Sequence, residues 1–149
     1  MRLVIVRHGE AVHPAVDAQR PLSERGLTQA AAIGQQLGAL GVQVAEIWHS
    51  SKERARQTAA GIAATLPGAP PPQEREGLRP NDPIQPVADT VATHDADIMV
   101  VSHLPFVQDL VDYLLSPHGK RSPPFPECGT VIMMRDGEGG WTLEQHLLP

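Results

Sequence analysis

The segment at residues 3–8, Leu-Val-Ile-Val-Arg-His, constrains the fold more than any other part of the chain. Its four consecutive apolar residues, three of them β-branched, predict a strand that is buried on both faces, as in a parallel sheet. Gly9 follows and allows the backbone to turn sharply and to approach a ligand closely. We therefore expect Arg7 and His8 at the carboxyl end of a central strand, where open α/β sheets bind their ligands.

An arginine and a histidine held side by side at such a position suit phosphoryl chemistry. A fixed imidazole can attack phosphorus, and a guanidinium can hold the phosphoryl oxygens. A buried strand that ends in charged residues is nevertheless common, so the tripeptide Arg7-His8-Gly9 does not decide the function alone.

A first helix is expected after a polar loop at residues 10–21. Ser23 is a good N-cap, and Gly41 ends the helix. Between them, apolar residues recur at helical spacing, namely Leu27, Ala30, Ile33, Leu37 and Leu40. Residues 42–48 then predict a second strand.

A second helix is expected at residues 52–66, with Ser50 or Ser51 as its N-cap. With Ser51 as the cap, Arg54 occupies the third helical position, near the positive end of the helix, which favours an anion. Its charged neighbours also fit a helix face exposed to solvent. The position of Arg54 alone therefore does not predict an anion site, and other residues must support it.

The clearest strand, at residues 98–101, ends in Ser102-His103. Pro105 suits the first turn of the apolar helix that follows. His103 therefore repeats the arrangement of His8, a buried strand followed by a histidine and a turn into a helix. Before this strand, we expect an irregular segment at residues 74–86, with Asp82 as its central carboxylate, and a short helix at residues 84–94.

Two further strands are expected at residues 130–134 and 141–145, and their Gly-rich connection marks a hairpin. The chain is thus predicted to be an α/β three-layer sandwich, with a mostly parallel central sheet, helices on both faces and an antiparallel C-terminal edge. Its 149 residues suit one domain, residues 1–149. If the strand ends are neighbours, two histidines and two arginines attract a phosphate dianion, although the net charge is −5.

Charge and composition exclude several classes of protein. The negative net charge argues against a nucleic-acid partner. The sequence contains no run of 18 apolar residues, so no membrane span is predicted. The chain shows no signal-peptide pattern, and the single Cys128 excludes an internal disulfide, so we expect a cytoplasmic protein. The sequence does not fix the oligomeric state, and a monomer is compatible with it.

The chain resembles the histidine phosphatase superfamily, also called phosphoglycerate mutase-like, in four segments that follow the family order. These segments are Val6-Arg7-His8-Gly9-Glu10, residues 22–30, residues 50–59 and Val101-Ser102-His103. The chain is most similar to the small bacterial phosphohistidine phosphatases of this superfamily, which share its short length, Arg20-Pro21-Leu22 and Leu104-Pro105.

The resemblance implies a role for each matched residue. His8 is implied as the nucleophile that becomes phosphorylated, and His103 as a hydrogen-bond donor that stabilises the phosphoryl group. The implied phosphate- and substrate-binding residues are Arg7, Gly9, Arg20, Arg54 and His103. The resemblance implies no cofactor and no metal.

One departure from the family pattern bears on the substrate. Phosphomonoesterases and mutases of the family usually have an acidic residue where Leu78-Arg79-Pro80 places a proline. An alkoxide leaving group needs protonation by such an acid. The imidazole of a phosphohistidine leaves as a neutral ring once protonated, and histidine titrates near pKa ~6.5. Asp82 or Glu10 remains available as a substitute acid.

The resemblance therefore implies a phosphatase that removes phosphate from a protein histidine, such as that of a phosphotransfer domain in a signalling relay, through phospho-His8. The short chain leaves little room for a lid, and an open site suits a phosphorylated protein. One alternative is a small-molecule phosphomonoesterase that hydrolyses a small phosphate ester with Asp82 or Glu10 as acid. Another is a non-catalytic phosphate-binding module. Mutase activity is disfavoured because it needs a closed pocket.

Overall fold

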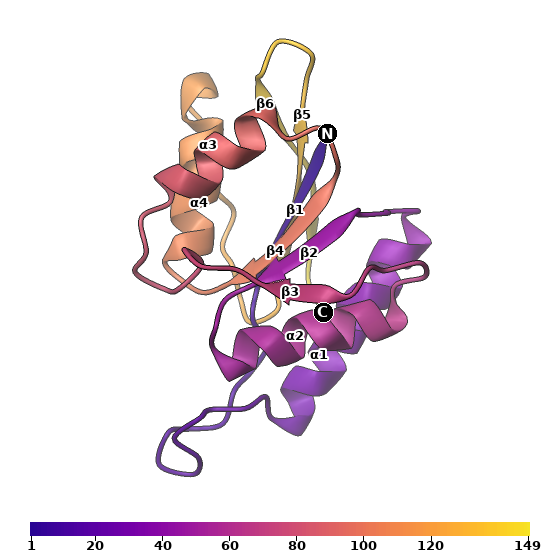
Figure 1. Ribbon diagram of the computed structural model, residues 1–149, viewed down its shortest axis with the longest axis vertical. Coiled ribbons are helices and arrows are strands. Elements are labelled where there is room, and N and C mark those ends of the chain that lie inside the picture. Colours follow the sequence, from indigo (N-terminus) through magenta and orange to yellow (C-terminus); the bar gives the residue numbers. More distant parts are fainter.

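The computed structural model describes residues 1–149 and places a six-stranded sheet between two layers of helices (Figure 1). The strands are β1 (Arg2–Arg7), β2 (Glu46–His49), β3 (Pro72–Glu74), β4 (Ile98–Ser102), β5 (Thr130–Arg135) and β6 (Trp141–Leu147). The helices are α1 (Glu24–Ala39), α2 (Glu53–Thr65), α3 (Gln85–Thr93) and α4 (Phe106–Leu115), which a 3-10 turn, η1 (Ser116–His118), follows.

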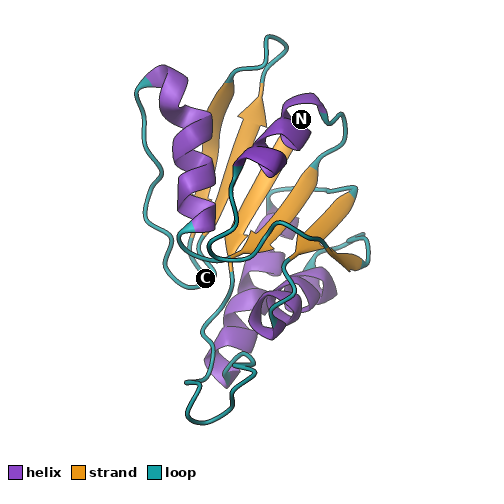
Figure 2. Cartoon of the chain, turned by 60° about the vertical axis from the view of Figure 1, so that its left-hand side comes forward, coloured by secondary structure: helices purple, strands orange, loops and turns teal.

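The sheet confirms the predicted α/β sandwich with its mostly parallel centre. The strand order is β3-β2-β4-β1-β5-β6, in which β3, β2, β4 and β1 run parallel to one another and β5 runs antiparallel to both of its neighbours, β1 and β6. The four central residues of β1 are fully buried, as expected for a strand that is covered on both faces. Figure 2 shows the sheet with α3 and α4 on one face and α1 and α2 on the other.

The strand register brings the polar ends of three strands to one edge of the sheet. Arg7 of β1 pairs with Ser102 of β4, and His49 of β2 pairs with Val101. The chain leaves β1, β4 and β2 at nearly the same level, so His8, His103 and Ser50 lie at a common edge.

The second strand is shorter than predicted. It begins at Glu46 rather than at residue 42, because the amide of Val42 donates to the carbonyl of Leu37 and so closes the end of α1. The sequence predicts no strand between the second helix and residue 98, but Pro72–Glu74 forms the edge strand β3, which overlaps the segment expected to be irregular only at Glu74. This strand has no apolar alternation, and it forms through its pairing with β2.

The apolar face of α1 is narrower than its sequence pattern predicts. Ala30, Ile33 and Leu37 are fully buried, whereas Leu27 and Leu40 are 49% and 45% exposed. The buried face packs closely against α2, where a Cβ on Gly34 would lie 1.9 Å from Thr65 Oγ1. None of the helices combines the length and the apolar character that crossing a membrane would require.

Candidate active site

The end of β1 is fixed on both sides by hydrogen bonds. The amide of His8 donates to the carbonyl of Ser102 on β4 at 2.9 Å, and the Arg7 amide donates to the carbonyl of Gly129 at 3.0 Å. The Arg7 guanidinium also donates through Nη1 to the carbonyl of Phe125 at 3.0 Å. The backbone that carries both side chains is therefore held rigidly at the sheet edge.

The His8 imidazole is buried and oriented by its own loop. Its Nδ1 lies 2.7 Å from the carbonyl oxygen of Gly9, and because a carbonyl only accepts, Nδ1 carries the hydrogen. Burial, together with the positive charges of Arg54, Arg7 and Arg20, lowers the pKa of His8 to about 4, against the opposing effect of the Gly9 carbonyl. At neutral pH the ring is uncharged, and Nε2 keeps a free lone pair.

The loop after His8 is wedged between α1 and α2. The Gly9 amide donates to Thr58 Oγ1 at 3.0 Å, and Thr58 in turn donates to the carbonyl of Arg54 at 2.7 Å. On the other side, a Cβ on Gly26 would lie 2.1 Å from the carbonyl oxygen of Glu10. Only a glycine at position 26 allows α1 to approach the loop this closely.

The start of α2 differs from the prediction in its cap. Lys52 is the N-cap and makes no side-chain capping bond, so Ser51 is not the cap and Arg54 occupies the second helical position. Ser50 is turned inward instead, where its Oγ accepts from the Lys52 amide at 3.3 Å and lies 2.6 Å from His103 Nε2. Arg54 still lies at the positive end of the helix.

His103 faces His8 across the site. Its side chain is almost fully buried, and the two ring centroids are 5.0 Å apart. Burial is the main reason that the pKa of His103 falls to about 3, and His8, Arg54, Lys52 and Arg20 lower it further. Both histidines are therefore neutral at pH 7.

Three buried nitrogen atoms around this pair have no hydrogen-bond partner in the protein. They are Arg7 Nε, Arg54 Nε and His103 Nδ1. Buried polar atoms without a partner are rare in folded proteins, and each needs an explanation. Fixed donors that converge beside a free imidazole nitrogen can bind a tetrahedral oxyanion and stabilise the charge on its oxygens.

Arg20 brings a further positive charge to the site. It has a left-handed backbone with φ 48°, and its Nε donates to the carbonyl of Val12 at 3.1 Å. Its charge acts on the pKa values of His8, Arg54 and His103. The positive charge of Arg20 therefore lies near His8, Arg54 and His103.

The two candidate acids are engaged elsewhere. Asp82 accepts from the Arg79 amide at 2.8 Å and lies 3.5 Å from Arg79 Nε. Glu10 accepts from the Ser23 hydroxyl at 2.9 Å and lies 3.5 Å from Arg25. The charges that act on the pKa of His8 are those of arginines alone.

The position where the family usually has an acid lies close to the sheet edge. Ser102 Oγ donates to the carbonyl of Leu78 at 2.6 Å, so the loop is tied to the end of β4. This loop continues into Pro80, which has no ionisable side chain.

Sequence reasoning missed the residues that hold the site together. Ser50, Thr58 and Gly26 lie within the segments that carry the family resemblance, but only their tertiary contacts reveal what they do. His49 is also buried, with Nδ1 2.8 Å from the carbonyl oxygen of Ser50. No three His, Cys, Asp or Glu side chains cluster as metal ligands would.

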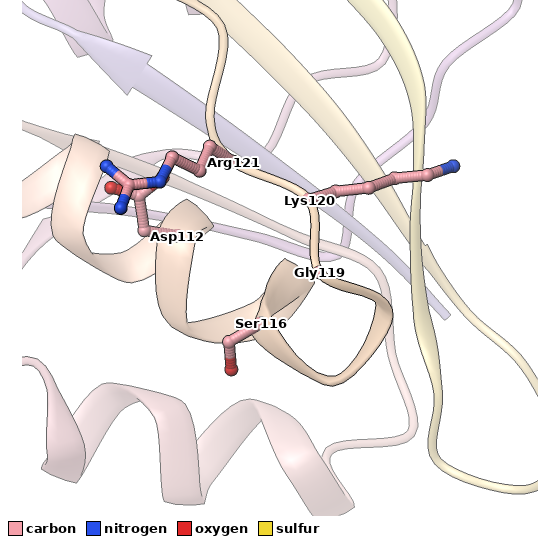
Figure 3. A pocket seen from close by; sticks show the side chains of 5 residues that line it. All are labelled: Asp112, Ser116, Gly119, Lys120 and Arg121. Atoms are coloured by element: carbon pink, nitrogen blue, oxygen red, sulfur yellow. The ribbon is translucent and has the colours of Figure 1, made fainter.

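A separate hollow of about 360 Å³ lies at the far end of α4 (Figure 3). It is lined by Asp112, Ser116, Gly119, Lys120 and Arg121. Arg121 lies beside Asp112, whereas Lys120 extends away from them. None of the candidate site residues lines this hollow, because α4 runs from His103 toward the opposite edge of the sheet.

Comparison with known proteins places this geometry in a family. Residues 3–82 match the histidine phosphatase superfamily, branch 1. The chain belongs to this superfamily. An uncharacterized protein from Picosynechococcus sp. is 36% identical over 112 residues, which cover 70% of this chain and 67% of that protein.

Two solved structures of phosphatases share this fold over nearly the whole chain. The protein histidine phosphatase SixA, complexed with tungstate, superposes with a TM-score of 0.89 and 26% identity, over 100% of this chain and 97% of that chain. A phosphoserine phosphatase from Entamoeba histolytica, in complex with 3-phosphoglyceric acid, has a TM-score of 0.73 and 17% identity, over 99% and 97% of the two chains. This histidine phosphatase is a SixA-like hydrolase.

Proposed function

We propose that this histidine phosphatase removes phosphate from a phosphorylated histidine on a protein, through phospho-His8. In the first step, Nε2 of His8 forms a bond to phosphorus, and the P–N bond of the substrate breaks. The substrate imidazole leaves as a neutral ring after it has been protonated. In the second step, water attacks phospho-His8, inorganic phosphate departs and the neutral His8 imidazole is restored.

The observation that carries this proposal is a free lone pair on His8, together with three buried donors of Arg7, Arg54 and His103 that have no partner in the protein. The Gly9 carbonyl occupies Nδ1 of His8, which leaves Nε2 as the nucleophile. Arg7 Nε, Arg54 Nε and His103 Nδ1 are buried without protein partners, and we assign them to the phosphoryl oxygens. Positioning and charge stabilisation of this kind supply most of the catalysis in phosphoryl transfer.

Gly9 and Arg20 complete the proposed binding residues. A Cβ at Gly9 would lie 3.0 Å from the carbonyl oxygen of Gly26, so a larger residue there would crowd the contact between this loop and α1. Arg20 supplies a third guanidinium charge near these residues, and we assign it to the substrate.

The choice of a protein phosphohistidine rests on the leaving group. Asp82 and Glu10 are held by Arg79 and by Ser23 with Arg25, so neither carboxylate is free to protonate an alkoxide. A phosphohistidine needs no such acid, because imidazole protonates near pH ~6.5. The likeness to SixA, a protein histidine phosphatase, supports the same substrate class.

A small phosphate ester is the second candidate substrate. The fold of a phosphoserine phosphatase from Entamoeba histolytica matches along nearly the whole chain. For this chain to act on an alkyl ester, Asp82 or Glu10 would have to leave its present partners and reach the leaving oxygen.

The test is a direct comparison of substrates with purified protein. A phosphorylated histidine phosphotransfer domain, an aryl phosphate and a panel of sugar phosphates are each incubated with wild type, His8→Ala and Asp82→Asn. We expect rapid dephosphorylation of the protein by wild type and by Asp82→Asn, and none by His8→Ala. Efficient turnover of a sugar phosphate that Asp82→Asn abolishes would instead establish the small-ester activity.

A further inference from the structure

The Ser50 hydroxyl contacts His103 in a part of the structure that excludes solvent. Ser50 is fully buried and His103 is 1% exposed, and Ser50 Oγ lies 2.6 Å from His103 Nε2. The two residues follow the neighbouring strands β2 and β4. The contact therefore joins two rigid elements at the edge of the sheet where His8 also lies.

The surroundings of the hydroxyl determine the direction of this hydrogen bond. Ser50 Oγ accepts from the Lys52 amide at 3.3 Å, and His103 is its other hydrogen-bond partner. The hydroxyl hydrogen can be used only by pointing at Nε2 of His103. The reverse direction would leave a buried hydroxyl hydrogen without an acceptor, which is rare in folded proteins.

The direction of the bond fixes the tautomer of the ring. A neutral imidazole has one N–H, and a nitrogen that accepts a hydrogen bond cannot carry it. If Nε2 accepts from Ser50, the hydrogen lies on Nδ1. That atom is buried and has no partner in the protein, so its N–H is available to a ligand.

We propose that Ser50 is a positioning residue that holds His103 as the Nδ1–H tautomer and thereby directs a hydrogen-bond donor at the phosphoryl group. The part of this inference that concerns phosphate rests on the proposed function of the site. Without the Ser50 hydroxyl, the ring is free to place its hydrogen on Nε2. Nδ1 then presents a lone pair to the phosphoryl oxygens, and an attraction becomes a repulsion.

The tautomer can be measured without any enzymatic activity. In protein labelled with ¹⁵N-histidine, the Nδ1 and Nε2 shifts of His103 distinguish the two tautomers at pH 7. We expect Nδ1–H in wild type and a shift toward Nε2–H in Ser50→Ala. Nε2–H in wild type, or an unchanged tautomer in Ser50→Ala, overturns the proposal. The wild-type spectrum alone decides the matter if the variants do not fold.

Kinetics with an aryl phosphate provide the second readout. Loss of one oxyanion donor lowers kcat by about 100-fold, and we expect a fall toward this size in Ser50→Ala, with a smaller change in KM. Ser50→Thr, which keeps a hydroxyl, should recover both the tautomer and kcat. Ser51→Ala is the matched control, because Ser51 is exposed and is not the cap of α2. A lower kcat in Ser50→Ala with the wild-type tautomer would show a merely structural role.

These two readouts separate the two proposals. If wild type shows no His8-dependent hydrolysis of any phosphate, the proposed function fails, whereas the spectrum still reports on Ser50 and His103. If hydrolysis depends on His8 but the tautomer does not depend on Ser50, only the positioning proposal fails.

Discussion

The His8 and His103 rings lie 5.0 Å apart between centroids, with their planes inclined by 56°. Each ring is held at one nitrogen, His8 by the Gly9 carbonyl and His103 by the Ser50 hydroxyl. Because Nδ1 of His8 donates to a carbonyl, its Nε2 keeps a free lone pair. Because Nε2 of His103 accepts from a hydroxyl, its Nδ1 keeps a free N–H. Two residues of the same type thereby obtain opposite roles in the proposed mechanism, as nucleophile and as hydrogen-bond donor.

The first prediction concerns the titration of His8. Burial and the charges of three arginines lower its pKa to about 4, so an NMR titration of wild type should show a midpoint near that pH. Arg54→Gln removes one of these charges and should raise the pKa of His8. Arg56→Gln is the matched control, because Arg56 is exposed and pairs with Glu53. An equal effect of both variants would contradict the proposed place of Arg54 beside His8.

The second prediction concerns stability in acid. The folded state holds His8 at a lower pKa, about 4, than the unfolded chain, ~6.5, so the unfolded state binds more protons between these values. The free energy of unfolding should therefore fall as the pH falls through this window. For His8 alone, the fall between pH 7 and pH 4.5 is about 2 kcal/mol.

Urea denaturation at both pH values checks this expectation. His8→Gln cannot titrate in this range, so its loss of stability on acidification should be smaller than that of wild type by about this amount. Equal losses in the two proteins would mean that His8 is protonated as readily in the folded state as in the unfolded chain.

The third prediction concerns the geometry of Arg54. A lysine keeps the positive charge but lacks the planar set of donors that a guanidinium presents to a phosphoryl group. Arg54→Lys should lower kcat/KM by about 100-fold, the usual size of the loss of one fixed donor to a transition state. Steady-state kinetics with the phosphorylated protein substrate provide the measurement. A loss below threefold would indicate that Arg54 acts through its charge alone.

The sequence predicts most of the architecture because burial patterns are local. The apolar run in β1 and the same pattern in β4 identify two central strands, and the turn residues beyond them place His8 and His103 at one edge. The Ser23 cap was also predictable, since its side chain accepts from the Gly26 amide within one helical turn.

The missed features depend on contacts between distant segments. β3 carries no strand pattern of its own and exists because β2 offers it an edge. Ser50 looks like a helix cap in the sequence, yet a histidine 53 residues away uses its hydroxyl. The family resemblance indicates that these segments are important, but only the packing shows what each side chain contacts.

The fourth prediction concerns the link between the Gly9 loop and α2. Thr58 is fully buried, and its hydroxyl accepts from the Gly9 amide and donates to the Arg54 carbonyl. Thr58→Val keeps the shape but leaves the Gly9 amide without a partner, which costs about 1–3 kcal/mol of stability. Activity should fall as well, because the same bonds align the loop with Arg54. Thr58→Ser keeps the hydroxyl and should preserve activity, as thermal unfolding and kinetics on both variants can establish.

The last prediction concerns the contact between α1 and the Gly9 loop. A Cβ on Gly26 would lie 2.1 Å from the Glu10 carbonyl oxygen, and because this oxygen belongs to the backbone, Gly26→Ala must push the helix and the loop apart. Overpacking of this kind costs about 1–3 kcal/mol. The displaced loop carries His8, so activity should fall together with stability.

Gly137→Ala is the matched control for this substitution. Nothing lies within 4 Å of a Cβ at Gly137, which is in the turn between β5 and β6. Its stability and activity should stay close to those of wild type. Urea denaturation and a phosphatase assay on both variants separate a general effect of alanine from the specific clash. Wild-type activity in Gly26→Ala would show that the loop can hold His8 in place without its close contact with α1.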